Sequence, residues 1–156
     1  MRGYTLLETV IYVSILAVIA VLALGSILSV YKAFGKTKVE RKLALNGDVA
    51  MERMLRDTRS AASTDAVVSI FGSSPGVLKI GGTQFSLSGS VLQVAEDAGT
   101  PQALTSDVNV SNLVFYRAVS ANSEIIKIEM TLQAGSGIFQ KSKNFYGSAV
   151  LRGIYR

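Results

Sequence analysis

Cysteine and histidine are both absent from the 156-residue chain. Without cysteine it can form neither disulfide bonds nor thiolate metal sites, so redox chemistry does not indicate its compartment. Without histidine it lacks the commonest general base and a common metal ligand. The serines form no G-x-S-x-G motif, and the glycine pairs lie in expected turns rather than in a phosphate-binding loop. We therefore expect neither an enzyme nor a cofactor.

Charged side chains are also absent from residues 9–31, which are mostly apolar. At ~1.5 Å per residue, a helix over this run spans the ~30 Å hydrocarbon core of a bilayer. A secretory signal peptide is the first alternative, but its apolar region has only ~7–15 residues and ends at a small-residue cleavage site that is missing here. Residues 4–31 are therefore predicted to form a helix that spans the membrane in contact with lipid.

One acidic residue, Glu8, stands at the start of this run. A carboxylate inside a bilayer costs at least ~2.5–3.5 kcal/mol unless a partner neutralises it. Glu8 therefore predicts a nearby cation, and an ordinary uncleaved anchor gives no account of it.

The segment Gly3-Tyr4-Thr5-Leu6-Leu7-Glu8, after the basic residue Arg2, resembles the processing motif of type IV pilins and type II secretion pseudopilins. In that family a prepilin peptidase cuts after the glycine and N-methylates the new first residue. The resemblance implies a leader over residues 1–3, cleavage between Gly3 and Tyr4, and methylation of Tyr4. Cleavage would leave an ammonium group on Tyr4, one helical turn from Glu8, so the two groups could pair within a chain or between neighbours.

The resemblance also implies partners and a location. The partners are the peptidase, other pilin-like subunits, an assembly platform membrane protein and the lipid bilayer. The chain would cross the cytoplasmic membrane once, with its C-terminal domain outside, and would then enter a periplasmic or cell-surface filament. Residues 51–59, with the sequence MERMLRDTR, are similar to the end of the stem in J-class minor pseudopilins, which act at filament tips.

Residues 32–63 are predicted to continue the helix as an amphipathic stem, because apolar residues recur at spacings of three and four. We expect this stripe to pack on the sheet of the same chain, and bends at Gly35 and Gly47, since each glycine costs ~1 kcal/mol relative to alanine. Glu52 and Arg56 stand at a favourable i,i+4 spacing. The stripe comprises Val39, Leu43, Gly47, Ala50, Met51, Met54, Leu55, Thr58, Ala61 and Ala62.

The net charge of +5 is concentrated in the stem, between Lys32 and Arg59. By the positive-inside rule, these cations would place the C-terminal domain in the cytoplasm, opposite to the location that the resemblance implies. They also leave a second function open, in which a surface component binds DNA or another polyanion through the stem. A simple membrane-anchored domain is the third alternative.

Residues 64–156 show an alternation of period two and are predicted to form a β-rich domain, giving an α+β fold with an antiparallel sheet. The acidic loop at residues 95–102 contains Glu96 and Asp97, which together with Asp107 could be considered calcium ligands. The spacing of an EF-hand loop is absent, so we predict no metal site. The expected strands are residues 67–71, 77–80, 83–87, 91–94, 112–119, 124–133 and 144–152.

Overall fold

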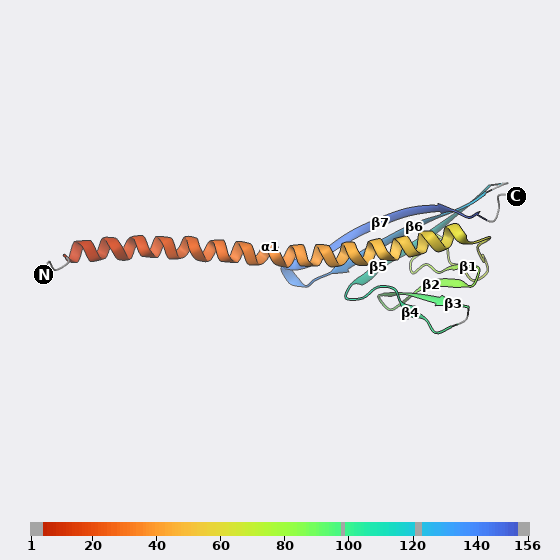
Figure 1. Cartoon of the computed structure of the whole chain (residues 1–156), viewed down its shortest axis with the longest axis horizontal. Helices are drawn as coiled ribbons and strands as arrows, with labels where there is room; N and C mark the ends of the chain where they lie inside the picture. The colour runs from red at the N-terminus through yellow and green to blue at the C-terminus, as the bar shows by residue number, and fades with distance from the viewer. Residues whose placement is uncertain (1–4, 98, 121–122, 153–156) are drawn as a thin grey trace. The chain divides into compact units, whose positions relative to one another are not determined.

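A computed structural model describes residues 5–97, 99–120 and 123–152, and it has the predicted α+β fold (Figure 1). One long helix, α1 (Leu6–Ser60), precedes two antiparallel sheets. The chain divides into two compact units, Met1–Lys38 and Val39–Arg156, so that α1 contributes to both. The helix is unbroken through Gly35 and Gly47, where the sequence predicted bends.

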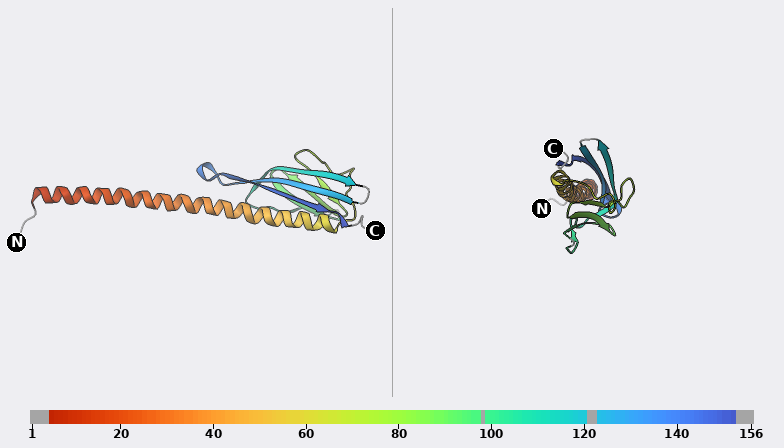
Figure 2. Two further views of the ribbon diagram at one scale, coloured as in Figure 1. Left: turned by 90° about the horizontal axis from the view of Figure 1, so that it is seen from above. Right: turned by 90° about the vertical axis from the view of Figure 1, so that its right-hand side faces the viewer.

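Both sheets belong to the second unit (Figure 2). The first has the order β1-β2-β3-β4, and the second has the order β5-β6-β7, so neighbours in sequence are neighbours in space throughout. A short 3-10 helix, η1 (Gly137–Phe139), lies between β6 and β7. The strands are β1 (Leu78–Ile80), β2 (Thr83–Ser88), β3 (Val91–Glu96), β4 (Gln102–Ala103), β5 (Asn109–Ser120), β6 (Ser123–Ala134) and β7 (Lys141–Val150).

The central strand β6 follows the predicted alternation. Its apolar side chains at every second position are buried, while Lys127 and Glu129 on the opposite face form a salt bridge of 2.7 Å. Residues that alternate in this way place one face of a sheet on the core and leave the other in water. The buried members are Ile126, Ile128, Met130 and Leu132.

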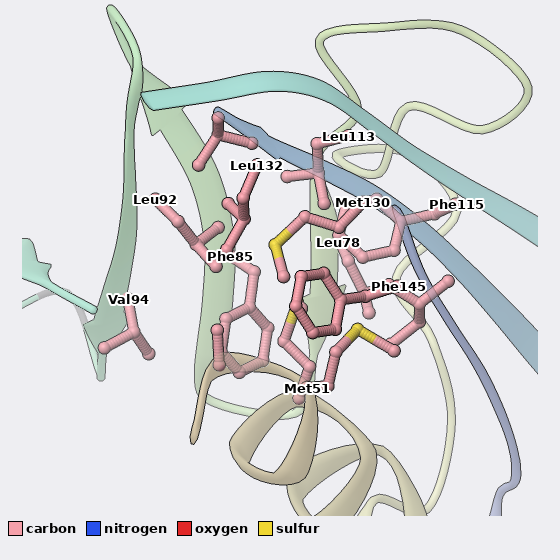
Figure 3. Packing of buried hydrophobic residues seen from close by; sticks show 14 of the residues in the cluster. Met51, Leu78, Phe85, Leu92, Val94, Leu113, Phe115, Met130, Leu132 and Phe145 are labelled. Carbon is pink, nitrogen blue, oxygen red and sulfur yellow. The ribbon is translucent and has the colours of Figure 1, made fainter. Parts of the chain in front are cut away.

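Within the second unit, the apolar stripe of α1 packs against both sheets in one core, as predicted (Figure 3). The ring of Phe145, from β7, lies directly on Gly47, and a Cβ atom at that position would overlap the ring. Gly147 of β7 likewise leaves room for side chains of α1, because a Cβ there would lie 2.6 Å from Met51 Cε and 2.9 Å from Leu55 Cδ1. The two glycines therefore let α1 and β7 interlock at short range.

The strand predicted at residues 67–71 is wrong. This segment instead forms a turn, with isolated bridges between Thr64 and Ile80 and between Ile70 and Val77. The Asp65 carboxylate accepts hydrogen bonds from the backbone N–H of Val67 at 3.0 Å and of Val68 at 3.4 Å. A side chain that bonds its own backbone in this way competes with a strand ladder, and here it outweighs the β-propensity of valine.

Several predicted boundaries also move. Helix α1 ends at Ser60 rather than at residue 63, and its end is closed by the Ala61 N–H donating to the carbonyl of Asp57. The predicted loop at residues 95–102 contains the end of β3 and the start of β4. Strand β7 begins three residues earlier than expected, because it pairs with β6 along its whole length, from Lys141 opposite Ala134.

A buried carboxylate joins the segment after α1 to the second sheet. Glu124 has a side chain only 4% exposed, and it accepts a hydrogen bond from Arg117 Nε at 2.6 Å and another from Thr64 Oγ1. Burial raises the pKa of Glu124, but the hydrogen bonds from Arg117 and Thr64 outweigh burial and leave its pKa below the ordinary value. Glu124 is therefore charged at neutral pH.

We expect Glu124→Gln to destabilise the protein by about 1–3 kcal/mol at pH 7, the cost of weakening a buried charged hydrogen bond. Because the folded pKa lies below the unfolded one, the ionised carboxylate stabilises the fold above the unfolded pKa, and this contribution is lost as the pH falls through the folded pKa. Urea unfolding of the full-length protein in detergent, at a series of pH values, measures both effects. An unchanged difference between the two proteins at acidic and neutral pH would contradict this assignment.

Candidate functional site

The predicted cleavage site at Gly3 and Tyr4, and the methylation site at Tyr4, lie outside the described residues. Glu8 is described and lies in the first turn of α1. Thr5 precedes the helix, and its Oγ1 accepts a hydrogen bond from the Glu8 backbone N–H at 3.3 Å, as an N-cap residue does. An acidic side chain at this position also interacts favourably with the helix dipole, by about 0.3–1 kcal/mol. Thr5 and Glu8 thus define where the helix begins.

Tyr12 is a neighbour of Glu8 that the sequence analysis missed. Its hydroxyl donates to Glu8 Oε1 at 3.5 Å, and the i,i+4 spacing on a helix was the signal that could have revealed it. A phenol supplies a hydrogen bond but no positive charge. Among the residues that the structure describes, no lysine or arginine forms an ion pair with Glu8. The described contacts therefore leave the charge of Glu8 uncompensated.

The first half of α1 exposes a continuous apolar surface. Eighteen large apolar side chains from Leu6 to Phe34 are 49–82% exposed, and the most apolar window, with a mean hydropathy of 2.7, has none of its residues buried. At about 1.5 kcal/mol for each side chain, burying them would stabilise the protein by on the order of 25 kcal/mol. The helix is long and apolar enough to cross a membrane.

Carboxylates of the second unit neutralise part of the basic stem. Arg53 Nε bonds Asp57 at 2.6 Å, and Arg53 Nη2 bonds Glu96, while Lys42 Nζ lies 3.4 Å from Asp107. The hydrogen bond to Asp57 and its negative charge are the main reasons that the pKa of Arg53 is raised. Two of the three acidic residues considered as calcium ligands are thus engaged with stem cations.

The third, Asp97, lies at a turn with a φ of 44°, and its backbone N–H donates to the carbonyl of Gly82 at 2.9 Å. Among the described residues, no group of three or more acidic side chains gathers in an arrangement that could hold a metal ion. The loop is therefore bound to the rest of the unit by ion pairs and backbone hydrogen bonds.

Comparison with protein-family models, curated proteins and solved structures gives no match for this chain. The function must therefore be argued from its own N-terminal segment and fold.

Proposed function

We propose that this chain is a pilin-like structural subunit, cleaved and N-methylated by a prepilin peptidase and assembled into a type IV pilus or a type II secretion pseudopilus. The observation that carries the proposal is the first half of α1, an exposed apolar surface that begins at Glu8, a carboxylate for which the described residues supply no cation. Before assembly a membrane would bury the apolar side chains in lipid, and after assembly neighbouring helices would bury them. Neither satisfies the charge of Glu8.

Removal of Met1, Arg2 and Gly3 would supply the missing cation. The new ammonium group of Tyr4 would lie at the start of the same helix, and in a filament the amine of a neighbouring subunit would pair with Glu8. A buried charge that loses its partner costs about 3–5 kcal/mol, so subunits at the wrong axial position would be rejected. Hydrophobic burial would thus supply most of the association energy, and the ion pair would align the subunits.

Within this class, the chain is best explained as a minor, J-type pseudopilin. The support is the resemblance of residues 51–59 to the end of the J-class stem, on a helix whose apolar stripe packs against antiparallel sheets. The proposed orientation places the second unit outside the cytoplasmic membrane, because the peptidase acts on the cytoplasmic side. The assembly platform and other pilin-like subunits are the proposed partners.

Ion pairs neutralise part of the basic stem, which weakens the case for polyanion binding along it. A phosphate backbone needs lysine and arginine side chains that are not already neutralised. Arg53 and Lys42 are already paired with carboxylates. The cations near the membrane, Lys32, Lys36 and Lys38, would be covered by neighbouring subunits in a filament.

Mass spectrometry of the N-terminal peptide from the native host tests the processing step. We expect a mature chain that begins at Tyr4, lacks Met1, Arg2 and Gly3, and carries one additional methyl group. The same measurement on cells without the prepilin peptidase should give an unprocessed chain. A chain that begins at Met1 in peptidase-containing cells, with no polymer containing it, would leave only the simple anchored domain.

A further inference from the structure

Three arginine side chains line one pocket near the C-terminal ends of α1 and β7. Arg56 and Arg59 stand three residues apart on the last turns of α1, and Arg152 follows the end of β7. With Ser60, Val150 and Leu151 they line a pocket with a volume of about 460 Å³. Ligand pockets in proteins usually have about 300–1,000 Å³, so this one can hold one or two side chains of a partner.

Among the residues that the structure describes, carboxylates compensate the positive charge of this pocket only weakly. Arg56 Nε lies 3.8 Å from Asp57, but that carboxylate is held more closely by Arg53, at 2.6 Å. The structure brings no other acidic side chain of the described residues within salt-bridge distance of Arg56, Arg59 or Arg152, and the expected pair between Glu52 and Arg56 is not formed. The three guanidinium groups that line the pocket repel one another, and a bound anion would reduce that repulsion.

The lining indicates which kind of anion fits. Val150, which is exposed, and the aliphatic stems of the arginines supply the apolar part of the lining. Guanidinium groups bind carboxylates through two parallel hydrogen bonds, which adds geometric specificity to charge. The carbonyl groups at the carboxyl end of α1 stabilise the arginines and offer no backbone N–H groups to an anion, so binding would depend on the guanidinium groups. A carboxylate beside an apolar side chain matches both parts of this lining.

We propose that the pocket formed by Arg56, Arg59 and Arg152 is a docking site for a partner protein, and that it binds a peptide segment in which an acidic residue adjoins an aromatic or aliphatic one. This site is independent of N-terminal processing, so it can fail while the proposed function stands. It also differs from the polyanion surface considered for the stem, because it requires an apolar contact and Arg152, which follows β7.

Fluorescence anisotropy with the full-length protein in phosphatidylcholine nanodiscs tests this site. The probes are a labelled peptide of sequence Asp-Phe-Glu with blocked ends, its neutral counterpart Asn-Phe-Gln, and a labelled single-stranded oligonucleotide. We expect the acidic peptide to bind at least about tenfold more tightly than the neutral one, since each charge-assisted hydrogen bond is worth about a factor of ten or more. Absence of binding by the acidic peptide would overturn the proposal.

Matched variants separate the pocket from general charge attraction. Arg59→Gln and Arg152→Gln should each weaken binding of the acidic peptide by about tenfold or more, because both side chains are exposed and can be replaced without disturbing the core. Arg59→Lys keeps the positive charge but replaces the planar guanidinium group with an ammonium group. We therefore expect its affinity for the acidic peptide to lie between those of the unchanged protein and Arg59→Gln. Arg41→Gln, an exposed stem arginine outside the pocket, should change the affinity by less than about twofold.

Two outcomes would contradict the docking site even if the peptide binds. An equal loss with Arg41→Gln would mean that the stem attracts anions in general. Tighter binding of the oligonucleotide, lost in Arg59→Gln and Arg152→Gln, would mean that the pocket takes nucleic acid instead. Thermal unfolding of each variant, compared with that of the unchanged protein, verifies that the second unit remains folded.

Discussion

Glu8→Ala is expected to leave the protein in the membrane and to reduce its incorporation into filaments by about a hundredfold or more. Insertion should be unaffected, because removing a carboxylate makes the apolar helix easier to bury. Assembly should fail, because the ammonium of a processed Tyr4 would then be buried without its partner, at a cost of about 3–5 kcal/mol. The measurement compares the membrane fraction with the sedimented filament fraction from the native host, by immunoblot. Normal filaments from this variant would remove the proposed role of Glu8.

The Tyr12 hydroxyl provides the matched control for this experiment. Tyr12→Phe removes the hydrogen bond to Glu8 Oε1 but leaves the carboxylate charged. If Glu8 acts through an amine of a neighbour, Tyr12→Phe should assemble almost normally. Glu8→Gln, which keeps the size and the hydrogen-bonding ability of the side chain but not its charge, should fail like Glu8→Ala. Equal defects in Tyr12→Phe and Glu8→Ala would instead assign the role to the contact within one chain.

Gly47→Ala is expected to destabilise the second unit by about 2 kcal/mol, although alanine is the better helix former. Helix propensity alone predicts a gain of ~1 kcal/mol. The added Cβ, however, would overlap the ring of Phe145, which is buried against α1, and overpacking of a core costs about 1–3 kcal/mol or more. A net loss of this size should lower Tm by on the order of 10 °C in a domain of roughly 120 residues.

Two further variants test whether the steric clash with Phe145 causes the loss of stability. Gly25→Ala makes the same exchange in the same helix, at a position where the structure describes nothing within 4 Å of the added Cβ, so no loss of stability is expected. Combining Gly47→Ala with Phe145→Leu should cost less than the sum of the two single changes, because the smaller side chain makes room for the methyl group. Strict additivity in this double-mutant cycle would show that Gly47 and Phe145 do not act on one another.

The amount that could be predicted from the sequence depended on the range of the interactions involved. The stripe of α1 and the alternation in β6 follow from periodicity, and the structure buries the predicted residues Leu43, Met54, Ile128 and Leu132. The turn after Asp65 is local as well, but its side-chain hydrogen bond overrides the valines that suggested a strand. A prediction based on residue propensities does not include hydrogen bonds from a side chain to its own backbone, so it missed this turn.

Contacts between distant parts of the chain could not be predicted. From the sequence, Gly47 was expected only to weaken the helix, whereas in the structure its missing side chain makes room for the Phe145 ring of β7. The arginine pocket has the same origin, because nothing near Arg152 in the sequence indicates that it lies beside Arg56 and Arg59. The candidate ion-pair site at Glu8 was suggested by a motif, while its hydrogen bond with Tyr12 appears only once the helix is built.

The ion pair between Glu40 and Lys141 joins residues 101 positions apart, and the contact of Gly47 with Phe145 is nearly as distant. Because β7 comes much later in the chain than α1, the stem helix is synthesised long before the strand that covers it. Contacts so far apart in sequence form slowly, since a large loop must close before they stabilise anything. During translation, therefore, the apolar stripe of the stem stays uncovered by β7 until that strand has been synthesised.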